Sequence, residues 1–151
     1  MAVLKVVHYG DPILRKECKQ VTDYKVLPEI IENMFDTMYE EEGIGLAANQ
    51  VGIDMNLMII DVSHTDEAED ANIFVNGEII ESFGSSEMEE GCLSIPDVRL
   101  PVKRPEKLDL NMNYLMDQNT LVILMVYLEE LFSMRWIILK EFLLLTELIL
   151  Y

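Results

Sequence analysis

One cysteine in the stretch Glu90 to Pro96 is the residue in this chain with the clearest chemical potential. Cys92 follows Gly91, which lets another group approach the backbone closely. Pro96 keeps the segment from joining the middle of a sheet. A thiolate in such a stretch serves either as a metal ligand or as a nucleophile. The alternative is a small buried hydrophobic residue, which is the usual role of a lone cysteine.

A second unusual stretch runs from Gly43 to Gly52 and reads G-I-G-L-A-A-N-Q-V-G. Its small residues let another chain lie alongside the backbone, although a tight packing loop would have the same composition. Taken together, the two stretches resemble the peptide deformylase family. In that family the first motif reads G-Φ-G-Φ-A-A-x-Q, where Φ is a bulky apolar residue, and the second reads E-G-C-Φ-S.

Both motifs are present without a mismatch and in the family's order, and the segment from Val7 to Arg15 is also similar. The resemblance covers residues 1–105. It implies removal of formate from the N-terminal formyl-methionine of new polypeptides. It also implies a divalent metal, commonly ferrous iron with zinc or nickel as substitutes, held by one cysteine and two histidines beside a water.

The resemblance assigns roles to individual residues. Cys92 is the expected metal ligand, and Gln50 and the backbone N–H of Leu93 are expected to stabilise the oxyanion of the transition state. Contacts to an extended peptide substrate are expected from Ile44, Gly45, Gly91 and Arg99. The same resemblance pairs Arg104 with Glu90, which would hold the cysteine segment in place. For both arginines the alternative is a solvated surface charge.

The family's third motif, H-E-x-x-[DE]-H on a late helix, is absent from this chain. Residues 106–151 contain no glycine, proline or histidine, whereas all seven glycines and five prolines lie earlier. Leu124, Leu128 and Leu131 are spaced for one face of a helix, but apolar residues cover the other faces too. Charged residues interrupt every apolar run long enough to span a bilayer.

A shift of reading frame near residue 106 accounts for this change of character. When the third base of each codon is read with the first two of the next, Trp136 followed by Ile137 forces aspartate. Across residues 130–146 the shifted frame permits V-I-Q-H-E-M-D-H-L-K-G-I-L-F-I-D, which contains the third motif. We therefore expect residues 1–105 to form a deformylase-like domain and residues 106–151 to be its frameshifted remainder.

Several functions stay open on the sequence alone. The first is a metal-dependent deformylase; the second is an inactive, deformylase-like peptide-binding relic, because two metal histidines and the catalytic glutamate are missing. Cys92 can also be a nucleophile with His8 or His64 as its base. Finally, residues 106–151 can serve as a hydrophobic interaction segment. We expect the chain as written to be inactive as a deformylase.

The composition limits the kinds of partner that the chain is expected to bind and the cellular compartment in which it is expected to work. Lys and Arg number 11 against 28 Asp and Glu, so the net charge is −17, which disfavours phosphate contacts with nucleic acid and docking on anionic membranes. Two cysteines and no recognisable signal peptide favour a reducing, cytoplasmic location. The implied partners are nascent formyl-Met peptides at the ribosome.

For the elements that position the motifs, the resemblance implies an α+β fold, with small antiparallel sheets packed around a central helix. Apolar spacing predicts a helix over residues 26–42, capped by Thr22 or Asp23, with a core face of Leu27, Ile30, Ile31, Met34 and Met38. Strands are predicted over residues 3–7, 57–62 and 98–102. A hairpin is predicted from residues 73–75 and 79–80 around Asn76-Gly77, and a loop over 82–89. Gln50 and Cys92 should line one cleft with Gly45 and Leu93.

Overall fold

The computed structural model describes residues 2–61, 63, 71–105, 107–117 and 120–128 of the 151-residue chain, and the statements below concern these residues. One α-helix and seven β-strands make up its regular elements, with three short 3-10 turns at Pro12–Arg15, Tyr24–Val26 and Ala48–Val51. The fold is α+β, as the sequence predicts. None of the described helices is long and apolar enough to cross a membrane.

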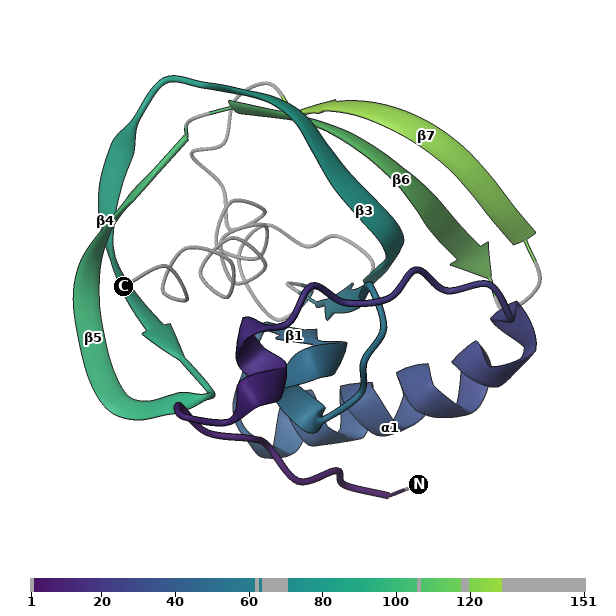
Figure 1. The fold of residues 1–151 in the computed structure, drawn as a ribbon, viewed down its shortest axis with the longest axis horizontal. Coiled ribbons are helices and arrows are strands. Elements are labelled where there is room, and N and C mark those ends of the chain that lie inside the picture. The colour runs from purple at the N-terminus through teal and green to yellow at the C-terminus, as the bar shows by residue number, and fades with distance from the viewer. Residues whose placement is uncertain (1, 62, 64–70, 106, 118–119, 129–151) are drawn as a thin grey trace.

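The strands form two antiparallel sheets. A five-stranded sheet has the order β1-β2-β3-β6-β7, and its strands span Gly45–Ala47, Leu57–Ile60, Asn72–Phe83, Lys107–Asp117 and Thr120–Leu128. The second sheet pairs β4, Ser86–Cys92, with β5, Ile95–Arg104. In Figure 1 the helix α1 (Leu27–Glu40) runs beneath β1, and β4 and β5 form a long ribbon on the opposite side from β6 and β7.

Helix α1 supplies the centre of the core. Pro28 stands in its first turn, where a missing backbone N–H costs nothing, and Asp23 caps the preceding 3-10 turn by accepting a hydrogen bond from the Lys25 N–H. The predicted core positions Ile31, Met34 and Met38 are buried. They pack in one cluster with apolar residues of two strands, including Leu57, Ile59 and Val75. The prediction that this helix face packs on the strand after residue 56 is therefore confirmed.

The end of α1 is set by Glu42. Glu42 takes a left-handed φ of 54°. The Gly43 N–H donates to the Met38 carbonyl at 2.8 Å, and the Glu42 N–H donates to the Tyr39 carbonyl at 3.1 Å, which together make a Schellman-type end. Gly43 is needed for space instead. A Cβ there would lie 3.0 Å from Cδ1 of Leu93, so the small residue lets the second motif approach the first.

The predicted hairpin around Asn76-Gly77 is wrong, because residues 72–83 form the single strand β3. Asn76 does take a left-handed φ of 56°, as the hairpin signal requires. However, the pairing of β3 with β6 shifts register between Val75 and Glu78, so the positive φ serves a β-bulge. Paired hydrogen bonds between Asn76 and Val21, and between Asn56 and Gly77, tie that bulge to segments outside the strand.

The ranges of several other predicted strands and loops also differ from those in the structure. Residues 3–7 form no strand, although the Val7 N–H donates to the Gln50 carbonyl at 2.8 Å. The predicted loop at residues 82–89 is mostly strand, because β3 continues to Phe83 and β4 begins at Ser86. The strand predicted over 57–62 is confirmed for 57–60, with Val62 outside the described residues, and 98–102 lies within β5. The backbone of residues 120–128 forms the strand β7, although Leu124 and Leu128 are spaced for one face of a helix.

Candidate functional site

Gln50 occupies the 3-10 turn that follows the edge strand β1, and its side chain is fully buried. Its Oε1 accepts a hydrogen bond from the Ala47 N–H at 2.9 Å. Because the oxygen is committed to this backbone donor, the amide nitrogen must point the other way. Nε2 faces Sγ of Cys92 at 3.7 Å. The local turn therefore presents Gln50 to the cysteine as a neutral hydrogen-bond donor.

Cys92 is the last residue of β4 and is half-buried. The pairing of β4 with β5 shifts register between Gly91, which faces Arg99, and Cys92, which faces Ile95. Such an irregularity turns a side chain away from the direction that a regular strand would give it. The shift therefore re-aims Cys92 at the point where its sulfur meets Gln50.

Leu93 joins the two motifs through packing. It is partly buried against the same hydrophobic cluster as α1, and its Cδ1 approaches Gly43 closely. The next residue, Ser94, is 1% exposed, and its Oγ has no hydrogen-bond partner among the described residues. The Ser94 carbonyl accepts a hydrogen bond from the Tyr9 N–H at 2.8 Å.

The N-terminal segment holds both motifs by backbone hydrogen bonds. Val7 donates to Gln50 in the first motif, and Tyr9, two residues later, donates to Ser94 in the second. Each donor comes from a peptide group, so the side-chain pattern of residues 3–9 carries no signal for this bridge. Sequence reasoning therefore missed it and interpreted the segment as a strand.

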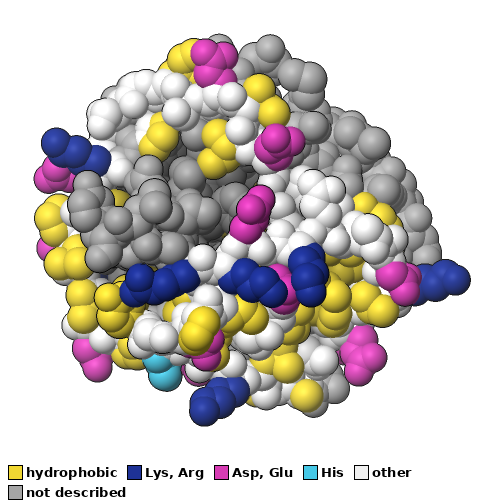
Figure 2. All heavy atoms as spheres, viewed as in Figure 1, with side chains coloured by type: hydrophobic (Ala, Val, Ile, Leu, Met, Phe, Trp, Pro, Cys, Tyr) yellow, Lys and Arg dark blue, Asp and Glu magenta, His cyan; other side chains and the backbone are white. Residues whose placement is uncertain are grey.

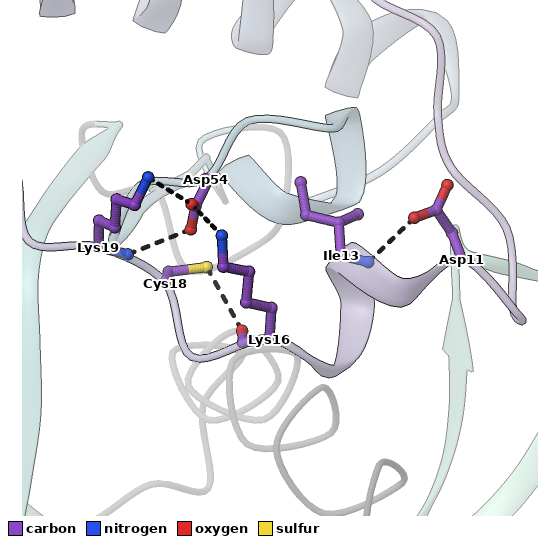
Figure 3. Close-up of polar contacts among 6 residues, drawn as sticks. All are labelled: Asp11, Ile13, Lys16, Cys18, Lys19 and Asp54. Carbon is purple, nitrogen blue, oxygen red and sulfur yellow. Dashed lines mark hydrogen bonds and ion pairs between the residues drawn. The ribbon is translucent and has the colours of Figure 1, made fainter.

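Asp54 anchors the loop that follows this segment (Figure 3). It lies between the ammonium groups of Lys16 and Lys19, 2.5 Å and 3.2 Å from its Oδ2, and the hydrogen bond from Lys16 holds its pKa below the usual range. Cys18 lies between the two lysines in sequence, and its thiol donates to the Lys16 carbonyl at 3.9 Å. Burial, followed by the charge of Asp54, raises the pKa of Cys18.

A cavity of about 480 Å³ lies beside Cys18 and is separate from the Gln50–Cys92 pair, neither of which lines it. Leu14, Ala47 and Asn49 contribute to its wall. The contact between Gln50 and Cys92 is present, and the cleft expected around it stays a prediction. Figure 2 shows that Lys and Arg side chains gather across the middle of one face despite the acidic composition.

The remaining site residues are distributed along two elements. Gly45 is buried in β1 opposite Ile60, and Ile44 precedes it, half-buried. Because β1 is the edge of its sheet, one side of it is unpaired within the described strands. Arg99 and Gly91 are exposed neighbours across β4 and β5. In the same ladder the backbone of Glu90 pairs with Leu100 and that of Arg104 with Ser86, and the expected ion pair between them stays a prediction.

Comparison with known proteins agrees with these motifs. The sequence model of the family described as polypeptide deformylase matches residues 3–132. The chain belongs to the polypeptide deformylase family. Its match to the peptide deformylase of Acidobacterium capsulatum is 42% identical over 108 residues, which is 71% of this chain and 64% of that relative. The chain thus spans under two thirds of the length of this deformylase.

Solved deformylase structures share the fold. The crystal structure of a Legionella pneumophila peptide deformylase has a TM-score of 0.74 and 35% identity, covering 86% of this chain and 74% of the other. The Met-Ala-Ser-bound class I type b deformylase of Acinetobacter baumannii has a TM-score of 0.76 and 28% identity, and the match covers 95% of this chain and 92% of the other. A peptide deformylase from Synechococcus elongatus, solved in complex with actinonin, has a TM-score of 0.77 and 33% identity, and the match covers 94% of this chain and 74% of the other.

Membership of the deformylase family implies a divalent metal. Among the residues that the structure describes, however, no three side chains of His, Cys, Asp or Glu come together as a metal site requires. The whole chain contains two histidines; His8 is exposed in the N-terminal turn, and His64 falls outside the described residues. The group through which Gln50 contacts Cys92 is an amide N–H, which is not a metal ligand. The residues that the structure describes therefore do not fit a centre of one cysteine and two histidines.

Proposed function

We propose that the Gln50–Cys92 site is built for the deformylase reaction, the hydrolytic removal of the formyl group from formyl-Met of nascent polypeptides. The observation that carries the proposal is the 3.7 Å contact between Gln50 Nε2 and Cys92 Sγ, because it unites two motifs of the family in one place. Membership of the deformylase family supports it independently.

The residues of this chain can perform two parts of that reaction. At Gly45, the side of β1 that has no partner among the described strands can add an extended peptide as a further strand, held by backbone hydrogen bonds. Gln50 is held with its N–H directed outward from the turn, so it needs no reorientation to donate to an oxygen that gains negative charge. One such donor contributes about 3 kcal/mol to stabilising a transition state. Leu93, Ile44, Gly91 and Arg99 would complete the contacts to the peptide.

A second candidate function is peptide binding without hydrolysis. It is favoured by the failure of the described residues to assemble a metal site and by the presence of only two histidines in the chain. In this case the chain as written keeps the substrate contacts of a deformylase but lacks its reaction centre. Iron, zinc or nickel would then be bound weakly, through Cys92 alone, and lost on dialysis.

The origin of residues 106–151 belongs to the same proposal. We propose that they are the frameshifted remainder of a deformylase domain that begins in residues 1–105. Sequencing the encoding DNA tests this directly, because a single inserted or deleted base near codon 106 should restore the third motif. A DNA sequence in which no alternative reading frame encodes the third motif would contradict it.

Calorimetry with formyl-Met-Ala-Ser, paired with a formate assay, tests the function. Binding with formate release supports a deformylase, and binding without formate release supports the peptide-binding candidate. Gln50→Met should weaken binding, whereas Cys18→Ser, which changes the cysteine outside the site, should not. If the unmodified chain shows no binding, both candidates are wrong. Action on nascent chains at the ribosome, in the cytoplasm, would follow from the first outcome.

A further inference from the structure

A hydroxyl–carboxylate contact joins the end of α1 to the end of β2. The Tyr39 hydroxyl donates to Oδ2 of Asp61 at 2.5 Å. Asp61 directly follows β2 and is 8% exposed, so this carboxylate is largely removed from water. The Tyr39 ring is half exposed and stacks on Phe35 one helical turn earlier, with ring centroids 5.9 Å apart. The ring is therefore held by the helix while its hydroxyl reaches the strand.

The same aspartate also holds the residue before β1. The Asp61 N–H donates to the Ile44 carbonyl at 3.0 Å, and Oδ1 accepts a hydrogen bond from the Ser63 N–H at 2.8 Å. Ile44 precedes Gly45, the first residue of β1, which pairs with Ile60. Asp61 thus contacts the helix through its side chain and the start of β1 through its backbone.

Between these two anchors the chain makes a sharp turn. It leaves α1 through Glu42, whose left-handed φ is unfavourable for a residue with a side chain, and reaches Ile44 two residues later. A strained link of this length keeps its shape only when both ends are fixed. The hydrogen bond from the Asp61 N–H to the Ile44 carbonyl fixes one end, and the hydrogen bond from the Tyr39 hydroxyl to the Asp61 carboxylate fixes the other.

We propose that Tyr39 and Asp61 are positioning residues that hold Ile44 and Gly45 in the place where a formyl-Met peptide binds. This inference rests on the proposed function, because it assumes that the edge of β1 receives the peptide. Neither residue touches the peptide. They act through the backbone of the link, and loss of the hydroxyl lets that link and the start of β1 move together.

The test compares Tyr39→Phe with Tyr24→Phe in the full chain. Tyr39→Phe keeps the ring on Phe35 and removes only the hydroxyl that reaches Asp61. Tyr24 is a matched control, because its hydroxyl accepts a hydrogen bond from Asn76 Nδ2 at 3.2 Å, near the other end of α1. The affinity for formyl-Met-Ala-Ser is measured by calorimetry, and exchange of the Asp61 amide proton is followed by NMR.

We expect Tyr39→Phe to weaken peptide binding roughly tenfold, the scale of one hydrogen bond to a charged group, and to speed exchange of the Asp61 amide. Tyr24→Phe should change neither quantity, even if it lowers stability by a similar amount. Equal affinities in the two variants, or an equal loss in both, would overturn the positioning role while the proposed function stands. Absence of binding by the unmodified chain would instead overturn the proposed function and the inference with it.

Discussion

Gln50 shows how one side chain can connect two parts of a site. Its oxygen satisfies the buried Ala47 N–H in its own turn, and its nitrogen reaches Cys92 on another sheet. The two bonds depend on each other, because the first fixes the orientation that makes the second possible. A family motif that requires glutamine at this position is thus explained by local hydrogen bonding as well as by chemistry.

Replacing Gln50 with methionine should lower the free energy of unfolding by roughly 1–3 kcal/mol. Methionine has a similar volume but leaves the Ala47 N–H buried without an acceptor. Urea denaturation measures the loss. The neighbouring Asn49 is a suitable control, because it is also buried but does not accept the hydrogen bond from the Ala47 N–H, so Asn49→Ala should cost less. Equal losses in the two variants would show that Gln50 contributes only by packing.

Tyr39 should make stability depend on pH in the alkaline range. Burial first, then the hydrogen bond to Asp61 and its charge, raise the pKa of Tyr39 from 10.0 to about 12. A pKa raised by folding gives stability that is fully present below the unfolded value and is lost as the folded group ionises. The difference in unfolding free energy between the unmodified chain and Tyr39→Phe should therefore be constant below pH 10 and shrink as the pH approaches 12. A constant difference throughout would contradict the contact.

At the scale of elements, the bulge in β3 is the feature that links distant segments. Asn76 Oδ1 accepts from the Val21 N–H at 2.7 Å, and Nδ2 donates to the Val21 carbonyl at 3.0 Å. These bonds attach the segment before α1 to the middle of the sheet. Local signals for an Asn-Gly hairpin and for an Asn-Gly bulge are the same, and the long-range partner, Val21, decides between them.

Asn76→Ala should lower the free energy of unfolding by roughly 2–4 kcal/mol, because it leaves the N–H and C=O of buried Val21 without their partner. Asn76→Gly loses the same bonds but accepts the left-handed φ freely, so it should be about 1 kcal/mol more stable than the alanine variant. Thermal or urea denaturation of both separates the two contributions. If alanine and glycine are equally stable, the positive φ carries no strain.

For the whole molecule, the sequence predicted the α+β class, the core face of α1, and the contact between Gln50 and Cys92. These rest on short-range spacing and on motifs, both of which are visible in one sequence. The bulge at Asn76, the left-handed Glu42 and the backbone bridge from Val7 and Tyr9 were missed. Each depends on a partner distant in sequence or on a peptide group, and neither leaves a trace in side-chain type. The roles of Arg99, Arg104 and Glu90 stay predictions.

Formate release from formyl-Met-Ala-Ser, measured together with bound metal after dialysis, tests the central claim most directly. Two proteins should be compared: the chain as written, and a version in which the shifted frame replaces residues 106–151. A catalytic site of this kind needs about three protein ligands, and the chain as written offers Cys92 without the two histidines. We predict turnover and one retained metal in the shifted-frame protein, and neither in the chain as written. Stoichiometric metal with formate release from the chain as written would support the deformylase candidate but contradict the central claim, that residues 106–151 of this chain do not supply the missing metal ligands.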